Sequence, residues 1–307
     1  MNENFQNDSA DALGEATFKT RRTRWQRLRI ELKKAPPTAI FGMLVIITYI
    51  FVAIFAPLLA PYGEADNSFA ALLPWGDGHL FGTDQIGRDI FSRLIYGTRN
   101  TMGIAFVTTL LAFVIGCGLG LISAINQSWL DQLISRAVDV LMAIPALIFA
   151  LMMLSIFGSS VTSLIIIIAV LDSTRVFRLT RAVAVGVVVM DYVEAARLRG
   201  EGLGWVMRQE VLPNIMPPLV AEFALRFCFV FLTIAALSFL GLGIQPPAAD
   251  WGSMVRETAN MIQFANFDFK ASLTPLLPAA AIALITVSVN FVADWLLQIS
   301  SGLRDEH

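Results

Sequence analysis

Long apolar runs alternate with polar and charged stretches along most of this sequence. A helix needs about 20 apolar residues to cross a bilayer core about 30 Å thick. Backbone groups in lipid must be paired within the segment, so such runs predict helices, and the period-two pattern of barrel strands is absent. The pattern predicts an all-α membrane protein that crosses the bilayer about six times. The six runs lie at roughly 38–60, 101–125, 137–157, from about Val161 through Val170 and past Asp172, 219–240 and 275–298.

The breaks between the runs carry residues that end helices. Pro36-Pro37 opens the first run and Pro61 closes it. The third run ends before Gly158-Ser159-Ser160, and the fourth begins directly after these residues. So short a connection predicts that the third and fourth helices form an antiparallel pair.

Composition supports the membrane class and argues against several others. The chain of 307 residues is 56% hydrophobic and 15% charged, whereas a soluble domain carries roughly a quarter charged residues. Cys117 and Cys228 lie in apolar runs, so we expect buried thiols and no disulfide framework. His79 and His307 are far apart in the sequence, so we expect no His-rich metal site.

Lysine and arginine are distributed unevenly among the connections, and this predicts the orientation. Cytoplasmic connections carry the excess of basic residues in membrane proteins. The tail before the first run holds eight, the connection between the fourth and fifth runs holds six, and the connections at 61–100 and 241–274 hold five together. With six crossings the tail and the 4–5 connection share one side. We therefore expect both termini in the cytoplasm and the two acidic loops outside.

The connection between the fourth and fifth runs has an unusual pattern. Glu194-Ala195-Ala196 favours a short helix, which we expect to end near Gly200. A second helical piece follows, and we expect it to stop at Pro213 and at Pro217-Pro218. Two short helices around a glycine break form a compact knob, whose small alanines would let it seat closely in a groove of another protein. An ordinary connecting loop fits the periodicity as well, so the pattern alone leaves both interpretations open.

Three stretches of the sequence resemble one family. Glu194-Ala195-Ala196, Gly200 and Leu212-Pro213 match the EAA loop of ATP-binding cassette (ABC) importer permeases. Residues 81–97 resemble the GTDxxGRD…SRLIYG segment, and residues 237–254 resemble the LSFLGLGxQPP…WGSM signature, of the second permease subunit of dipeptide, oligopeptide and nickel importers. The resemblance covers nearly all of the chain from about residue 38.

This resemblance implies the type I ABC importer permease fold with a cytoplasmic coupling helix. In the family the EAA loop docks on a cytoplasmic ATPase, and the two other stretches shape an outer gate under a solute-binding protein. The implied ATPase-coupling residues are Glu194, Ala195, Ala196, Gly200, Leu212 and Pro213. The implied external gate residues are Asp84, Arg88, Asp89, Gln245 and Trp251. The loop departs from the family at Arg197-Leu198-Arg199, where extra charges bear on the choice of ATPase.

The implied organisation divides the chain into four parts. Residues 1–36 form a basic cytoplasmic tail, in which Trp25, Leu28 and Leu32 recur at helical spacing. Either a helix lying on the anionic membrane surface or a tail without fixed structure fits that spacing. The other parts are 37–100, the first transmembrane helix and external loop; 101–300, the core permease domain with the EAA loop at 191–213; and 301–307, a cytoplasmic tail.

The chain lacks a G-x4-G-K-[ST] phosphate loop. Gly116, Gly118 and Gly120 lie inside the second run, where close helix packing explains them better than a nucleotide site does. We therefore expect a transport subunit and not an enzyme, with no cofactor of its own, and with ATP and Mg²⁺ held by partner ATPases. The expected partners are a second homologous permease, two ATPase subunits, a solute-binding protein and inner-membrane lipid, with no nucleic acid.

Charges inside the predicted spans are functional candidates, because each costs about 2.5–3.5 kcal/mol on insertion scales. Glu222 and Arg226 lie four residues apart on the fifth run. They either pair with each other structurally or line the path and contact charged groups of the solute. Asp139 follows Arg136 by three residues, which predicts a local pair.

Other functions predict other features. The same type of permease could carry nickel, glutathione, opines or sugars instead of peptides, since selectivity often resides in the separate binding protein. An ion-coupled secondary transporter would need midplane carboxylates, broken helices and internal repeats. We find no convincing repeat, and we expect the carboxylates near helix ends. A membrane-embedded enzyme would need catalytic groups within the spans, and both histidines lie outside them.

Overall fold

A computed structural model describes residues 35–76 and 78–300 of the chain. Contacts divide the chain into two units, Met1–Pro36 and Pro37–His307, and the second unit is described below. The basic tail at 1–34 and the tail at 301–307 lie outside the described residues. The expectations for those two tails therefore stay predictions.

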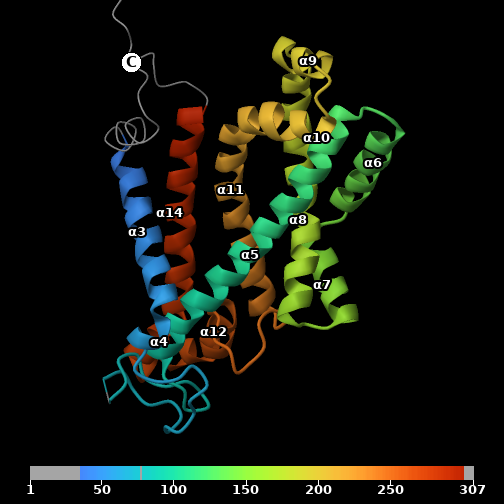
Figure 1. The fold of residues 1–307 in the computed structure, drawn as a ribbon. Coiled ribbons are helices and arrows are strands. Elements are labelled where there is room, and N and C mark those ends of the chain that lie inside the picture. Colours follow the sequence, from blue (N-terminus) through green and yellow to red (C-terminus); the bar gives the residue numbers. More distant parts are fainter. Residues whose placement is uncertain (1–34, 77, 301–307) are drawn as a thin grey trace, which may run out of the picture. The chain divides into compact units, whose positions relative to one another are not determined.

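Helices form nearly all of the regular structure in the described residues, where β pairing is limited to an isolated bridge between Thr83 and Asp89. Figure 1 shows α9 and α10 at one end of the long helices, and α4 and α12 at the opposite end. The elements are α3 (Pro37–Ile54), α4 (Ala56–Leu59), α5 (Ile90–Ile125), α6 (Trp129–Ala143), α7 (Ala146–Phe157), α8 (Val161–Val188), α9 (Asp191–Leu198), α10 (Leu203–Val206), the π-helix η1 (Met207–Val211), α11 (Leu212–Phe239), α12 (Trp251–Thr258), the 3-10 helix η2 (Ala259–Asn266), α13 (Phe269–Leu273) and α14 (Leu276–Ser300).

The membrane class predicted from the sequence is confirmed by these helices. Among the described residues, four helical segments are long and apolar enough to cross a bilayer: α3, α5, α10 through α11, and α13 through α14. The bent pair α6 and α7 makes a fifth if it is counted as one span. Helix α8 has 28 residues, enough length to cross, but it carries Asp172 and three arginines. Leu44 and Ile47 on α3 are mostly exposed, as side chains facing lipid are.

The third predicted span is broken, which corrects the expectation of one helix at 137–157. Helices α6 and α7 meet at an angle of 91°. Pro145 causes the break, because proline lacks an N–H and clashes with the preceding turn of a helix. Ile144 takes an extended conformation, as residues before proline prefer. The expected antiparallel neighbour, α8, follows α7 after three residues.

The helix after the knob does not stop at its prolines, which corrects a second expectation. Helix α11 continues through Pro217 and Pro218 to Phe239. Pro213 lies in the first turn of α11, where a missing N–H is tolerated. The wide π-helical turn of η1 comes just before it, and the Asn214 amide donates to the Glu210 carbonyl at 2.6 Å. Because proline has no backbone N–H, this turn has fewer backbone donors. The Asn214 side chain supplies a donor to the Glu210 carbonyl.

The second predicted span begins earlier than its hydropathy indicates. Helix α5 starts at Ile90, so the expected boundary between residues 100 and 101 falls inside this helix. Asp89 caps the start by accepting from the Ser92 backbone N–H at 2.7 Å. Polar residues such as Arg93 and Asn100 lie in the first three turns. They lower the hydropathy there, so the apolar run begins later than the helix does.

Small residues bring the long helices together. A Cβ added at Gly116 would lie 2.6 Å from the Ser173 carbonyl oxygen, and one at Gly120 would lie 2.8 Å from the Thr180 Cβ. Both contacts are with α8, so Gly116 and Gly120 serve close helix packing as the sequence predicts, whereas a Cβ added at Gly118 would meet nothing within 4 Å. On α3, Gly42 meets α14, where an added Cβ would lie 2.5 Å from the Ser288 carbonyl oxygen.

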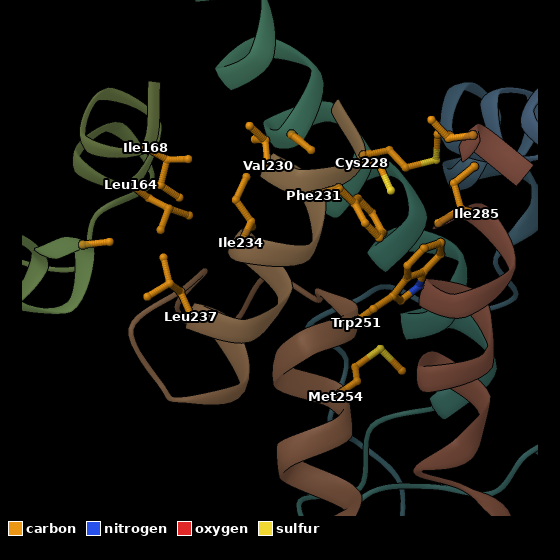
Figure 2. Close-up of a cluster of buried hydrophobic side chains, with 14 of the residues drawn as sticks. Leu164, Ile168, Cys228, Val230, Phe231, Ile234, Leu237, Trp251, Met254 and Ile285 are labelled. Atoms are coloured by element: carbon orange, nitrogen blue, oxygen red, sulfur yellow. The ribbon is translucent and has the colours of Figure 1, made fainter. Parts of the chain in front are cut away.

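A buried apolar cluster joins α11 to the segments around it (Figure 2). Phe231 of α11 points toward Trp251 of α12, with ring centroids 6.1 Å apart. Ile285 of α14 lies beside this pair, while Leu164 and Ile168 of α8 face α11 from the other side. The cluster thereby links α8, α11, α12 and α14.

Candidate functional site

The knob predicted between the fourth and fifth runs is present and consists of α9 and α10. Helix α9 ends at Leu198, and Gly200 follows with φ of 85°, a left-handed conformation that favours glycine. Pro213 is exposed, whereas Leu212 is half-buried. The six residues assigned to ATPase coupling thus lie on the knob or just beyond it.

The knob has a buried face and an exposed face. Val193 and Ala196 are fully buried and pack with Val206 and other apolar residues of the chain itself. Ala196 therefore does not present its small side chain to a partner, contrary to the expectation from sequence. Glu194, Ala195 and Leu198 are exposed, so these residues lie on the solvent-facing side of α9.

An open groove of about 640 Å³ lies beside the exposed face of α9. Its walls come from the end of α5, the end of α8 and α9 itself. Glu194 and Arg197 supply its charge, and Leu198 supplies apolar surface. The groove offers a shaped site next to the exposed residues of the knob.

At the opposite end of the helices, acidic and basic side chains from distant segments form one group, in which Glu257 is partly exposed and the other members are buried. We call Asp84, Arg88, Arg93 and Glu257 the loop network. Arg88 Nε donates to Asp84 Oδ2 at 2.7 Å, and Arg88 Nη2 donates to Glu257 Oε2 at 2.7 Å. Arg93 Nη2 donates to the same Glu257 oxygen at 2.9 Å. The network therefore ties the predicted gate segment at 81–97 to α12.

Asp89 and Trp251, two more predicted gate residues, are buried next to this network. Asp89 caps α5 and its Oδ1 lies 2.8 Å from His79 Nδ1. Trp251 donates its indole N–H to the Leu94 carbonyl at 3.0 Å, and its backbone N–H to Thr101 Oγ1 at 3.2 Å. Both residues are thus held by bonds to other parts of the same chain.

Gln245, the last predicted gate residue, stays within its own turn. Its side-chain amide donates to the carbonyls of Gly241 and Gly243 at 3.2 and 3.0 Å. It therefore shapes the loop after α11 and lies apart from the charged network.

Glu64 and Glu257 are site residues that sequence reasoning missed. Glu64 Oε2 accepts from the Asn100 side chain at 3.0 Å and from the Ala249 backbone N–H at 3.0 Å. It therefore joins the two loops, as Glu257 does. Both lie in stretches that the sequence predicts as loops, where acidic residues are ordinarily solvated. Their positions in the sequence therefore did not mark them as site residues.

Within the helices, Glu222 and Arg226 of α11 do pair, as the sequence allows. Arg226 Nε lies 2.7 Å from Glu222 Oε1, although this nitrogen makes no hydrogen bond in the described residues. Arg226 Nη1 lies 3.6 Å from Asp172 Oδ1 of α8, and Arg175 Nη1 lies at the same distance. These four residues, Asp172, Arg175, Glu222 and Arg226, are called the mid-helix network.

Asp172 corrects the expectation that carboxylates lie near helix ends. It is buried near the middle of α8. The signal was present in the sequence as an acid inside an apolar run, a pattern that marks a functional candidate by default. Its partner on α11 could not be read from spacing, because the two helices are far apart in sequence.

Asp139 pairs across helices, which corrects the expected local pair with Arg136. Its carboxylate accepts from Arg178 of α8. One end of α6 is also tied to α8, where Arg181 makes two bonds of 2.6 Å to Asp131. Two of the three arginines of α8 thus have acidic partners on α6, whereas Arg175 lies near Asp172 on α8 itself.

Two family models match the chain. The model described as a binding-protein-dependent transport system inner membrane component matches residues 116–302. The N-terminal TM domain of oligopeptide transport permease C matches residues 23–74. Together they span most of the chain and include the knob and Glu257, whereas Asp84, Arg88 and Arg93 lie between the two matches.

Curated relatives share about a third of the residues over most of the chain. The dipeptide transport system permease protein DppC of Alkalihalophilus pseudofirmus is 35% identical over 92% of this chain and 88% of that protein. The di/tripeptide permease protein DppC of Pseudomonas aeruginosa is 35% identical over 87% of this chain and 86% of that protein. The dipeptide permease protein DppC of Escherichia coli is 36% identical, covering 87% of each chain.

A solved structure shares the fold. The MetNI methionine ABC transporter in inward-facing form contains a chain that matches with a TM-score of 0.51 and 18% identity. The match covers 67% of this chain and 97% of that chain. At this identity the likeness concerns the fold alone.

Proposed function

The chain belongs to the family of binding-protein-dependent transport inner-membrane components and is a permease subunit of an ABC importer, and from that premise we propose that it forms half of a transmembrane path for peptides. It is a multi-pass inner-membrane protein. Peptides are favoured because the similar curated proteins are named for dipeptides and tripeptides. ABC importers of this family work with partner subunits and a solute-binding protein.

The exposed face of α9 is the observation that carries the proposed mechanism. Glu194, Ala195 and Leu198 project beside an open groove, at the end of the helices opposite to α12 (Figure 1). The inner face of α9 packs through Val193 and Ala196 on the permease body. A push on the exposed face would therefore pass to α8 directly and to α11 through η1. In our proposal the ATPase delivers that push when it closes on ATP.

The remaining partners follow from the same mechanism. The complete importer contains a second homologous permease, two ATPase subunits that bind ATP and Mg²⁺, and a solute-binding protein. Both termini and the knob face the cytoplasm, because the basic connections share that side. The loop network and the Gln245 turn then face outward and support the docking surface for the binding protein. Nucleotide binding shifts the permease pair between two states of access.

A bulky substitution on the exposed face of α9 tests the coupling. In Ala195→Trp the indole would occupy the docking surface while leaving the buried face intact, because Ala195 is exposed. We expect the assembled importer to lose most of its ATPase subunits during purification and to lose ATP-driven uptake of dialanine. Ala65→Trp, at an exposed position in the loop after α4, is the matched control and should retain the ATPases.

Three outcomes would contradict the proposal in different ways. Full retention of ATPases and wild-type uptake by Ala195→Trp would remove α9 as the docking element. Failure of the wild-type importer to take up dialanine, together with uptake of nickel, glutathione, an opine or a sugar, would replace peptides with the other solute. Uptake by this chain alone without ATP would contradict the ATP-driven mechanism.

A further inference from the structure

A polar cavity lies at mid-depth between the transmembrane helices. Its volume is about 180 Å³, and its walls come from α8, α11 and the bend between α6 and α7. Asp172 and Arg175 are the charged residues that line it, and Thr174 and Thr233 add hydroxyl groups. At 1.5 Å per residue, Asp172 lies about 17 Å along α8 from its first residue. That distance is about half the thickness of the bilayer core.

Asp172 lines this cavity, and one of its carboxylate oxygens has no hydrogen-bond partner in the described residues. The residue is only 7% exposed. Its Oδ1 lies 3.6 Å from both Arg226 and Arg175, too far for a hydrogen bond. Its Oδ2 is buried and has no hydrogen-bond partner in the described part of the chain. A buried carboxylate oxygen without a donor is costly, so its retention calls for an explanation.

The neighbouring charges leave Asp172 and Arg175 as the available pair. Glu222 engages Arg226 at 2.7 Å, so each of these two charges has a close partner of opposite sign. Arg175 has a half-exposed side chain, and its contact with Asp172 at 3.6 Å is the single ion pair that the described residues give it. The cavity wall therefore presents one acidic and one basic group, three residues apart on α8, and neither is fully engaged.

We propose that this cavity is a binding site for a small zwitterion, in which Asp172 accepts hydrogen bonds from an ammonium group and Arg175 donates to a carboxylate. The proposal deepens the peptide-permease function and rests on it, because the ends of a short peptide carry this pair of groups. An ammonium group in the cavity would supply a hydrogen-bond donor to the carboxylate of Asp172, which lines it. A carboxylate would give Arg175 the close partner that it lacks.

The competing explanation is a purely structural role, in which Asp172 only holds α8 against α11. The two explanations differ in ligand dependence. A structural ion pair predicts no preference among ligands with and without free ends. A binding site predicts that removal of Asp172 weakens only ligands with a free amino group, and that removal of Arg175 weakens only ligands with a free carboxylate.

The test measures direct binding to the assembled importer in lipid nanodiscs, without nucleotide and without the solute-binding protein. Saturation-transfer NMR suits it, because the method detects weak ligands in fast exchange. The probes are dialanine, N-acetyl-dialanine and dialanine amide. The wild type should bind dialanine best, since a charged hydrogen bond lost at either end weakens binding on the order of ten-fold.

The variants Asp172→Asn and Arg175→Gln assign each end of the ligand. Asp172→Asn should weaken dialanine and dialanine amide but leave N-acetyl-dialanine at its wild-type affinity. Arg175→Gln should weaken dialanine and N-acetyl-dialanine but leave dialanine amide unchanged. Arg175 is half-exposed, so its variant keeps the proposal testable if Asp172→Asn fails to assemble. Asp139→Asn and Arg178→Gln, an exposed pair outside the cavity, are matched controls that should bind all three probes like the wild type.

The results separate this inference from the peptide function. Equal dialanine affinity in the wild type and in either assembled variant would overturn the site, as would an equal loss for all three probes. Absence of dialanine binding in the wild type would also overturn the site. If ATP-driven dialanine uptake persists in that case, the peptide function stands and only the cavity assignment fails.

Discussion

The loop network and the mid-helix network contain the same residue types but differ in how completely those residues are bonded. In the loop network, Glu257 Oε2 accepts from both Arg88 and Arg93 within 2.9 Å, and Asp84 accepts from Arg88 at 2.7 Å. In the mid-helix network, Asp172 lies 3.6 Å from its two arginines and keeps one oxygen unbonded.

The difference indicates different roles. A buried ion network with every group bonded fixes the geometry of the segments that carry it, and loss of one member leaves the others uncompensated. The loop network does this for 81–97 and α12. A loosely bonded network at mid-depth can change partners at less cost, and a passing ligand can supply the missing bonds. One end of the molecule is thus fixed by closely bonded charges, while the interior keeps a carboxylate that is not fully bonded.

Loss of Glu257 should break the loop network with the largest effect on stability. Glu257→Gln removes the charge shared by Arg88 and Arg93, both buried. We expect destabilisation by about 3–5 kcal/mol, the usual result when one partner of a buried pair is removed. The measurement is the midpoint of thermal unfolding in detergent. A midpoint equal to that of the wild type would show that the two arginines do not depend on this carboxylate.

Loss of Asp89 should have the next largest effect. Asp89→Ala removes the cap of α5 and the partner of buried His79. We expect destabilisation by about 2 kcal/mol, from the lost cap together with a buried polar group left unpaired. Asp89→Asn keeps an acceptor for the Ser92 N–H and should recover part of the loss. Equal unfolding midpoints for the two variants would argue against the cap as the cause.

Loss of Glu222 should cost less, which sharpens the contrast between the networks. Glu222→Gln leaves Arg226 with Asp172 as a second acid nearby. We expect destabilisation by about 1 kcal/mol, because a second partner is in reach and the pair makes no hydrogen bond to begin with. A loss as large as that of Glu257→Gln would show that the mid-helix network is as tightly coupled as the loop network.

The exposed pair of Asp139 and Arg178 should matter least. More than half of each side chain is exposed, so solvent screens the interaction. We expect Asp139→Asn to change the free energy of unfolding by less than about 0.5 kcal/mol. The same thermal measurement at low and high salt provides the check, and a large salt-dependent loss would indicate a stronger role in holding α6.

The sequence by itself determined the membrane class, the position of most helices and the knob between α8 and α11. These features depend on local patterns. The patterns are the lengths of the apolar runs, the glycine that follows the short helix, and the helix-forming Glu194-Ala195-Ala196. The sequence also singled out 81–97 and 237–254, through their resemblance to a family, as segments predicted to form an outer gate. The sequence did not show which face of α9 is buried. Ala195 and Ala196 are the same residue type, and they differ in burial only once the chain has packed.

Only the tertiary structure decided which charges meet between different helices and loops. Spacing suggested that Asp139 pairs with Arg136, but helix packing places Arg178 closer. Glu257 meets Arg88 and Arg93, and Asp172 meets Arg226, across more than fifty residues of sequence. Such pairs depend on how helices cross, and crossing depends on the whole packed interior. The local sequence sets where a helix can form, whereas long-range packing sets what its side chains touch.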